Sequence, residues 1–161
     1  VRASIHAGMG DVPVVTPSAA ARMAFAALGV RSIAILTPYT LETTKPMAAY
    51  FMSHGMELSN VACLGLEDDR DMARVSDRTI FNAALAVDTA EAEAVFLSCT
   101  GLPAINVIAE LEERTGKPVV TSNQASAWMM ARLGGFTGHR PAQFGRLFDR
   151  ALPDHAFGEA A

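Results

Sequence analysis

The stretch Ala94-Val95-Phe96-Leu97-Ser98-Cys99-Thr100-Gly101-Leu102-Pro103 decides the fold. Its first four residues are apolar and too few to make a helix on their own, and small residues and a proline follow. Proline suits the first turn of a helix, where its missing N–H costs nothing. The stretch therefore predicts a buried strand, a turn and then a helix, with Cys99 at the carboxyl end of the strand.

A cysteine in this position is a candidate for chemistry, because open α/β folds bind ligands outside the carboxyl ends of their strands. The N–H groups of Thr100, Gly101 and Leu102, together with the positive end of the following helix, favour an anion there. The same field stabilises a thiolate, which would act as a nucleophile or exchange protons. The alternative is that Cys99 is a small buried apolar residue, as most free cysteines are.

The layout of strand followed by polar turn recurs earlier in the chain. A strand over 32–36 breaks at Thr37-Pro38-Tyr39, and a strand over 60–66 runs into Glu67-Asp68-Asp69-Arg70-Asp71. The Tyr39 hydroxyl could donate to a substrate carboxylate or enolate, or it could lie on the surface of a turn. The acidic cluster lacks further ligands at a matching spacing, so a solvated loop or helix start is expected there.

Four strands alternating with helices predict an α/β fold: a four-stranded parallel sheet with helices on both faces. Cys63 lies inside an apolar run and is expected in the core. The fourth strand is predicted over 117–121. The expected helices span 18–28, from a Thr40 or Thr44 cap to His54, 77–87, 104–114, from a Ser122 or Asn123 cap to Leu133, and 143–152 in the tail.

The composition indicates one soluble domain. The chain has 161 residues, of which half are apolar and 19% charged, which is enough to bury a core. It contains no membrane-length apolar run and no signal-peptide layout. A net charge of −4 without a basic cluster argues against nucleic acid. Two cysteines without a Cys-x-x-Cys pair and four scattered histidines favour a cytoplasmic protein without a disulfide framework or metal site.

Several motifs that follow one another along the chain carry a family resemblance. They are Thr37-Pro38-Tyr39, Leu66-Glu67-Asp68-Asp69 followed by Ala73-Arg74-Val75-Ser76, Ser98-Cys99-Thr100, and Pro118-Val119-Val120-Thr121-Ser122-Asn123-Gln124. With these motifs the chain resembles the aspartate/glutamate racemase superfamily over residues 13–147. Within that superfamily it is most similar to maleate cis-trans isomerases, arylmalonate decarboxylases and ectoine-utilisation proteins.

The resemblance implies two similar α/β halves around a pseudo-twofold axis, each supplying one cysteine to a shared cleft, without cofactor or metal. The first-half cysteine would lie just before Val1, and the chain starts without methionine, so we expect a longer protein. Residues 1–161 would then form a single α/β unit. In it, about 1–15 would be a remnant of the preceding half, 16–135 the core α/β half, and 136–161 a C-terminal helix and tail.

The same resemblance assigns roles to individual residues. Cys99 would be the second-half cysteine, and Tyr39 would contact the substrate. Asp69 stands where maleate isomerases tend to carry a carboxylate-binding asparagine, so it either points away or faces a donor on the substrate, which favours the ectoine-utilisation subgroup. The predicted catalytic residues are Cys99 and Tyr39, and the predicted substrate-binding residues are Thr37, Asp69, Thr100, Gly101 and Leu102.

The predicted function is that of a cofactor-independent, cysteine-based isomerase or racemase for a small carboxylate or dicarboxylate. One alternative is an arylmalonate-type decarboxylase, which needs a single cysteine as proton donor. Another is a non-catalytic domain that binds a small acid or serves in assembly. Since half of the cleft would lie outside the chain, activity is expected to need the missing half. Apolar edges left by that half also predict a homo-oligomer.

Overall fold

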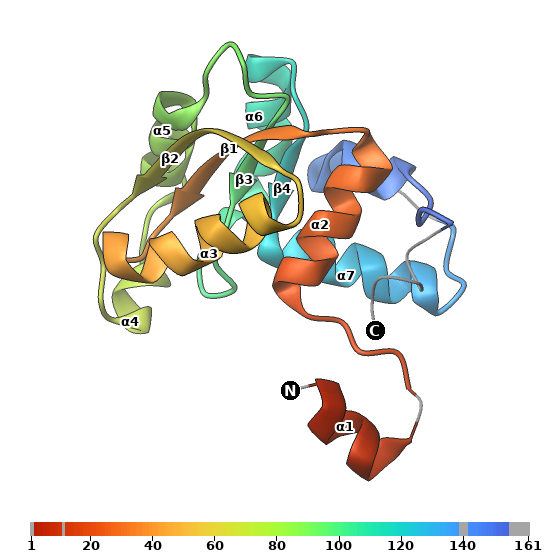
Figure 1. Cartoon of the computed structure of the whole chain (residues 1–161). Coiled ribbons are helices and arrows are strands. Elements are labelled where there is room, and N and C mark those ends of the chain that lie inside the picture. The colour runs from red at the N-terminus through yellow and green to blue at the C-terminus, as the bar shows by residue number, and fades with distance from the viewer. Residues whose placement is uncertain (1, 11, 139–141, 155–161) are drawn as a thin grey trace.

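A four-stranded parallel sheet in the order β2-β1-β3-β4 forms the centre of the computed structural model, which describes residues 2–10, 12–138 and 142–154 (Figure 1). The strands are β1 (Ser32–Thr37), β2 (Glu57–Cys63), β3 (Ala94–Leu97) and β4 (Val119–Thr121). The two central strands are almost entirely buried, as expected for a parallel sheet covered on both faces.

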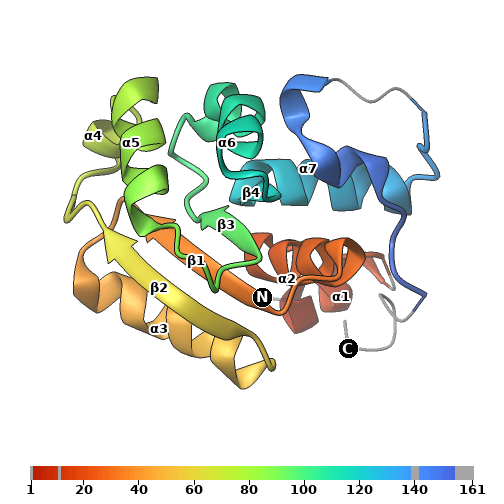
Figure 2. The same cartoon turned by 90° about the horizontal axis from the view of Figure 1, so that it is seen from above.

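Helices cover both faces of this sheet (Figure 2), which confirms the predicted fold class. On one face lie α2 (Pro17–Leu28), α3 (Leu41–Ser53) and α7 (Ser122–Leu133); on the other lie α5 (Asp77–Val87) and α6 (Ile108–Thr115). The remaining helices are α1 (Arg2–Met9), α4 (Asp69–Met72) and the 3₁₀-helices η1 (Ala104–Val107), η2 (Ala142–Phe144) and η3 (Arg146–Asp149). Within the described residues, no helix is long and apolar enough to span a membrane.

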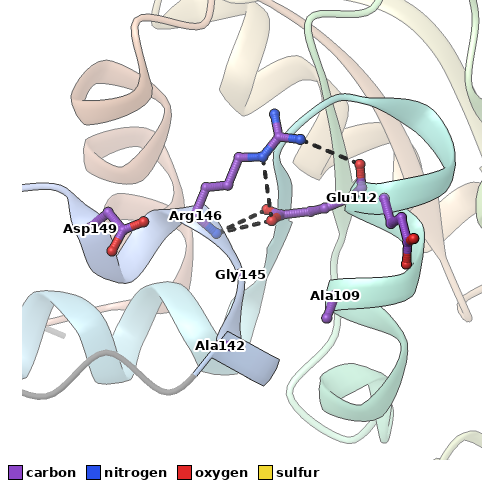
Figure 3. A pocket seen from close by; sticks show the side chains of 7 residues that line it. Ala109, Glu112, Ala142, Gly145, Arg146 and Asp149 are labelled. Atoms are coloured by element: carbon purple, nitrogen blue, oxygen red, sulfur yellow. Dashed lines mark hydrogen bonds and ion pairs between the residues drawn. The ribbon is translucent and has the colours of Figure 1, made fainter.

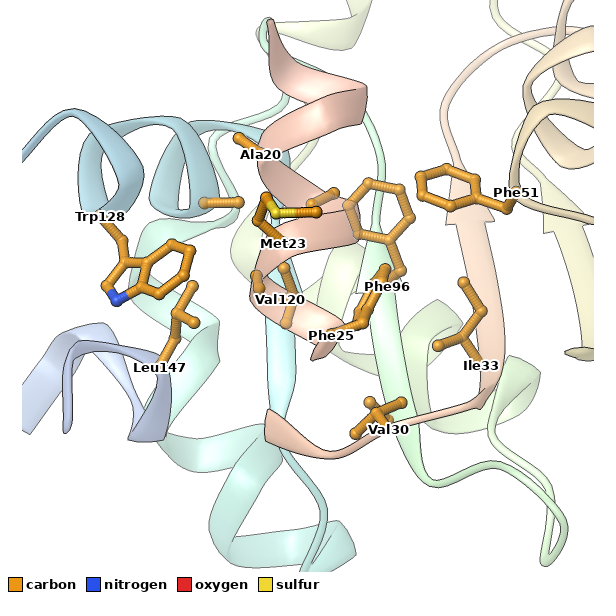
Figure 4. Close-up of a cluster of buried hydrophobic side chains, with 14 of the residues drawn as sticks. Ala20, Met23, Phe25, Val30, Ile33, Phe51, Phe96, Val120, Trp128 and Leu147 are labelled. Carbon is orange, nitrogen blue, oxygen red and sulfur yellow. The ribbon is translucent and has the colours of Figure 1, made fainter. Parts of the chain in front are cut away.

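Three aromatic rings anchor the core on the face of α2 and α3 (Figure 4). Phe25 of α2, Phe51 of α3 and Phe96 of β3 contact one another edge to face, with ring centroids 5.3–6.0 Å apart. The alanines of α2, among them the buried Ala20, leave room for this helix to approach the sheet. The aromatic cluster therefore ties two helices to the strand that leads to Cys99.

The helix starts follow capping chemistry. Helix α5 has the predicted bounds, and its N-cap Ser76 accepts the N–H of Thr79. Of the two predicted caps of α3, Thr40 is the one used, which leaves Pro46 inside the helix. The caps predicted for α7 are wrong: Thr121 is the N-cap and forms a capping box with Gln124. A threonine at the end of the strand thus ends β4 and starts α7 without a connecting loop.

Strand β2 begins and ends three residues earlier than predicted. The apolar residues that follow it form a connection that lies against the turn after β1, where Leu64 N–H donates to the Thr37 carbonyl and Gly65 N–H to the Tyr39 carbonyl. Cys63 is consequently the last residue of the strand and is half-buried. The prediction that Cys63 lies in the core is wrong.

The C-terminal segment, residues 142–152, contains two short 3₁₀-helices in place of the predicted helix over 143–152. Gly145 separates them at a φ of 70°, a conformation that favours glycine. A Cβ atom at this position would lie 2.7 Å from Ile108 Cγ2 and 2.8 Å from Glu112 Oε1. The segment thus turns where it meets α6. The tail beyond Asp154 lies outside the described residues.

Glu112 of α6 fixes this segment (Figure 3). Its side chain is buried, and its carboxylate accepts N–H groups from Val119 and Arg146 at 3.0 Å and pairs with the Arg146 guanidinium at 3.7 Å. Burial raises the pKa of Glu112, while the hydrogen bonds from Val119 and Arg146 oppose that rise. A cavity of about 390 Å³ borders this carboxylate, lined by Ala109, Glu112, Glu113, Ala142, Gly145, Arg146 and Asp149.

We expect the substitution Glu112→Gln to change how stability depends on pH. Because the pKa of Glu112 is higher in the folded protein than its ordinary value of 4.5, the folded protein binds more protons between these two values. The stabilising contribution of Glu112 is therefore complete below the ordinary value and is lost as the pH rises through the folded value. The free energy of unfolding of wild type relative to E112Q should be larger at pH 4.5 than at pH 7.

Urea denaturation of both proteins across this range measures the difference. A wild-type advantage that grows as the pH rises would contradict the expectation, because it would place the folded-state pKa of Glu112 below the unfolded one.

Candidate active site

Three connections meet at the carboxyl edge of the sheet and bring Tyr39, Asp69 and Cys99 together. Tyr39 follows β1, Asp69 is the first residue of α4 after β2, and Cys99 follows β3. The Tyr39 hydroxyl lies beside the Cys99 side chain and within electrostatic reach of the Asp69 carboxyl. Residues separated by 30 positions in the sequence thus meet because parallel strands end at one edge.

Tyr39 is arranged as a hydrogen-bond donor. Its burial raises the pKa of its hydroxyl far above the ordinary value, and its interactions with Cys99 and Asp69 raise the pKa further. The phenol therefore keeps its proton at neutral pH, so it can donate a hydrogen bond to a thiolate or to a substrate oxygen.

Cys99 sits at the end of β3, as the sequence predicts, with 6% of its surface exposed. The Gly101 N–H donates to its Sγ at 3.2 Å. Just before it, the hydroxyl of Ser98 donates to Met47 Sδ of α3 at 2.8 Å. The thiol thus lies between a backbone donor and the phenol of Tyr39.

The turn after Cys99 differs from the prediction in one respect. The helix predicted over 104–114 begins as the 3₁₀-helix η1 with Pro103 as its N-cap, and α6 starts only at Ile108. The donor closest to the thiol is consequently the Gly101 N–H itself and not the end of an α-helix. Thr100 and Gly101 are exposed, whereas Leu102 is buried in the core on the side of α5.

The other predicted binding residues take different places. Asp69 is exposed at the start of α4, beside Tyr39. Thr37 is fully buried, and its hydroxyl is hydrogen-bonded to that of Thr44 at 2.7 Å, which places it beneath the site. The binding of substrate by Thr37, Asp69, Thr100, Gly101 and Leu102 stays a prediction.

Asn123, which the sequence offers as a possible helix cap and which is not among the predicted site residues, is a neighbour of the site. Its Nδ2 donates to the Thr100 carbonyl at 2.9 Å. The register of the sheet could have indicated this contact, because Leu97 lies opposite Thr121 and the turns that follow β3 and β4 are therefore adjacent. In the part of the chain that the structure describes, no three His, Cys, Asp or Glu side chains are placed to hold a metal ion.

The structure is that of an α/β protein with a thiol and a phenol at the carboxyl edge of a doubly covered parallel sheet. The chain belongs to the arylmalonate decarboxylase family, whose characteristic sequence matches residues 2–148. This match confirms the resemblance to the group that includes the arylmalonate decarboxylases.

The relatives that the chain matches include two kinds of enzyme. The chain is 32% identical over 142 residues to the arylmalonate decarboxylase of Bordetella bronchiseptica, covering 87% of this chain and 59% of the relative. It is 28% identical over 121 residues to a maleate isomerase of Pseudomonas putida, covering 74% of this chain and 48% of the relative. The chain thus spans about half of the length of the curated relatives that it matches.

Solved structures share the fold. A crystal structure of arylmalonate decarboxylase superimposes with a TM-score of 0.79 at 32% identity, covering 92% of this chain and 65% of that one. A variant of the maleate isomerase Iso from Pseudomonas putida S16, solved with maleate, superimposes with a TM-score of 0.85 at 23% identity, covering 94% of this chain and 60% of that one.

Proposed function

We propose that the protein is a cysteine-based isomerase that acts on a small carboxylate, with Cys99 as the nucleophile. The observation that carries this proposal is the position of the Cys99 thiol between the Gly101 N–H and the Tyr39 hydroxyl. The proposal is supported by the maleate isomerases among the relatives. The chemistry uses side chains of the protein alone.

The isomerisation can be written with maleate as the test substrate. The Cys99 thiolate forms a C–S bond to one alkene carbon, and the π electrons move onto the neighbouring carbon and its carboxylate. The remaining single C–C bond rotates, the electron pair returns to form the trans double bond, and the C–S bond breaks to restore the thiolate. The Tyr39 hydroxyl would stabilise the negative charge that develops on the substrate oxygen.

The second candidate is decarboxylation of a malonate-type acid, which the family match and the 32% identity to an arylmalonate decarboxylase favour. Here a C–C bond of the substrate breaks, carbon dioxide leaves, and the electron pair remains as an enediolate. Cys99 S–H then donates its proton to that carbon, and water returns a proton to the thiolate. This reaction needs one thiol and a neutral donor, both of which the site holds.

Proton NMR of the full-length protein incubated with maleate and, separately, with phenylmalonate distinguishes the two reactions. The fumarate singlet should grow in the first sample if the protein is an isomerase. Loss of carbon dioxide and growth of phenylacetate in the second would instead establish the decarboxylase. Saturable binding of either acid without any product would contradict both and support the binding-domain alternative.

The substitution Tyr39→Phe should lower turnover about tenfold or more, because the hydrogen bond donor next to Cys99 is lost at the point where charge develops. The loss should be in kcat, with the melting temperature close to that of wild type. Tyr50→Phe makes the same chemical change on α3, away from this edge, and serves as the control. Equal turnover of wild type and Y39F would contradict the role of this hydroxyl.

A further inference from the structure

The peptide unit between Thr100 and Gly101 is hydrogen-bonded at both of its ends. Its carbonyl oxygen accepts from Asn123 Nδ2 at 2.9 Å, and its N–H donates to Cys99 Sγ at 3.2 Å. In a planar trans peptide these two groups point in opposite directions. One rigid plane therefore connects the amide of Asn123 with the thiol of Cys99.

Asn123 is not needed for the start of its own helix. The capping of α7 is complete without it, since Thr121 and Gln124 satisfy each other's backbone N–H groups in the capping box. The Asn123 side chain is exposed and reaches across to the turn after β3. It donates a hydrogen bond to the Thr100 carbonyl, which lies in the same connection after β3 as Cys99.

A donor on the carbonyl changes the other end of the peptide in two ways. It fixes the plane, so that the N–H stays directed at Sγ. It also draws electron density toward the oxygen, and hydrogen bonds in such a chain strengthen one another. Both effects strengthen the hydrogen bond from the Gly101 N–H to the sulfur. A stronger donor stabilises a negatively charged sulfur more than it stabilises a neutral thiol.

We propose that Asn123 is a positioning residue that orients and polarises the Thr100–Gly101 peptide so that its N–H stabilises the Cys99 thiolate. This inference deepens the proposed function, because it concerns the nucleophile of the same site. Asn123 acts through the peptide and is not assigned a contact with substrate. Tyr39 lies beside Cys99, and Asp69 lies within electrostatic reach of Tyr39; the variants below leave both titratable groups unchanged.

The test is the rate of Cys99 alkylation by iodoacetamide as a function of pH, followed by peptide mass spectrometry. Cys63 in the same molecule, half-buried at the end of β2, is the internal reference. The variants are Asn123→Ala, which removes the donor, and Asn123→Asp, which replaces it with a negative acceptor. Ala127→Asp is the matched control, since it adds the same charge to α7 one turn further on, at an exposed position.

Relative to Cys63, alkylation of Cys99 at neutral pH should be about three- to tenfold slower in N123A, the effect of one hydrogen bond. In N123D the midpoint of the alkylation curve should move up by about half a pH unit or more, because the new charge disfavours the thiolate. A127D should give the wild-type profile. Superimposable profiles for wild type, N123A and N123D would overturn the proposal, whether or not their melting temperatures differ.

The readout needs no substrate, so this inference and the proposed function can fail separately. If alkylation of Cys99 slows in N123A but neither maleate nor phenylmalonate is converted by wild type, the positioning role stands and the proposed function falls. If wild type converts one of these acids but the profiles of the variants coincide with its own, the proposed function stands and the positioning role falls.

Discussion

Replacing Cys99 with serine should reduce turnover of the carboxylate substrate by about a thousandfold or more while leaving the fold intact. A serine hydroxyl is far less acidic than a thiol, so it is a poor nucleophile without a strong neighbouring base. The described neighbour, Tyr39, is held in its protonated form and cannot take that role. Because the serine side chain has the same branching as that of cysteine and its oxygen can still accept the Gly101 N–H, the native structure should persist.

The measurement is kcat for the substrate identified by NMR, together with the melting temperature. Cys63→Ser is the matched control, because it makes the same chemical change in the other free cysteine. It should keep both turnover and stability close to those of wild type. Turnover by C99S at the wild-type rate would rule out every reaction in which this thiol forms a bond or transfers a proton.

Replacing Phe96 with alanine should have the largest effect on stability, about 3–5 kcal/mol. The Phe96 side chain is 1% exposed and contacts both Phe25 and Phe51 edge to face. Its removal leaves a cavity between β3 and the two helices and separates both remaining rings from a partner. Since domains are stable by only about 5–15 kcal/mol, this loss is a large fraction of the total.

Chemical denaturation of F96A against wild type measures this loss. Phe136→Ala is the matched control, since the same side chain is removed from a position that is 56% exposed, and it should cost less than about 1 kcal/mol. Similar midpoints for the two variants would show that the aromatic cluster is not the centre of the core. Phe96→Leu should fall between them, because leucine fills most of the volume.

The parts of the fold with redundant local signals are predictable from the sequence. Helix α5 has a serine cap and an apolar stripe at Ile80, Ala84 and Val87, and its observed bounds are the predicted ones. The predicted bounds of strand β2 are wrong because β2 is an edge strand with a half-exposed surface. Its first residues therefore lack an apolar pattern. Leu64 and Leu66, which follow β2 in the sequence, extend its apolar pattern although they belong to the connection after the strand.

The helix predicted in the C-terminal segment is wrong for a different reason. A pattern of apolar residues over 143–152 fits an amphipathic helix, but the contacts of Gly145 with Ile108 and Glu112 determine where the chain turns. Such a close approach between distant segments has no counterpart in local sequence.

Of the site, the sequence predicts which residues stand at the ends of strands, and the structure brings Tyr39, Asp69 and Cys99 together there. The direction of a single N–H cannot be predicted in this way. Neither the bond from Gly101 to the thiol nor the bond from Asn123 to Thr100 follows from a motif. The first depends on the conformation of one turn, and the second on the register of β3 and β4. The boundaries at 16 and 135, the division into two halves, the cytoplasmic location and the homo-oligomer stay predictions.

The way in which the C-terminal segment is held affects how freely its residues can vary. Glu112 accepts the main-chain N–H of Arg146, Gln124 donates to the carbonyl of Phe144, and Trp128 and Arg132 donate to the carbonyl of Arg150. Partners of this kind recognise the path of the backbone and not the identity of the side chains. Apart from Gly145, the buried Leu147 and Arg146, whose guanidinium pairs with Glu112, homologous proteins could change this segment extensively, while the four residues that hold it would have to be retained.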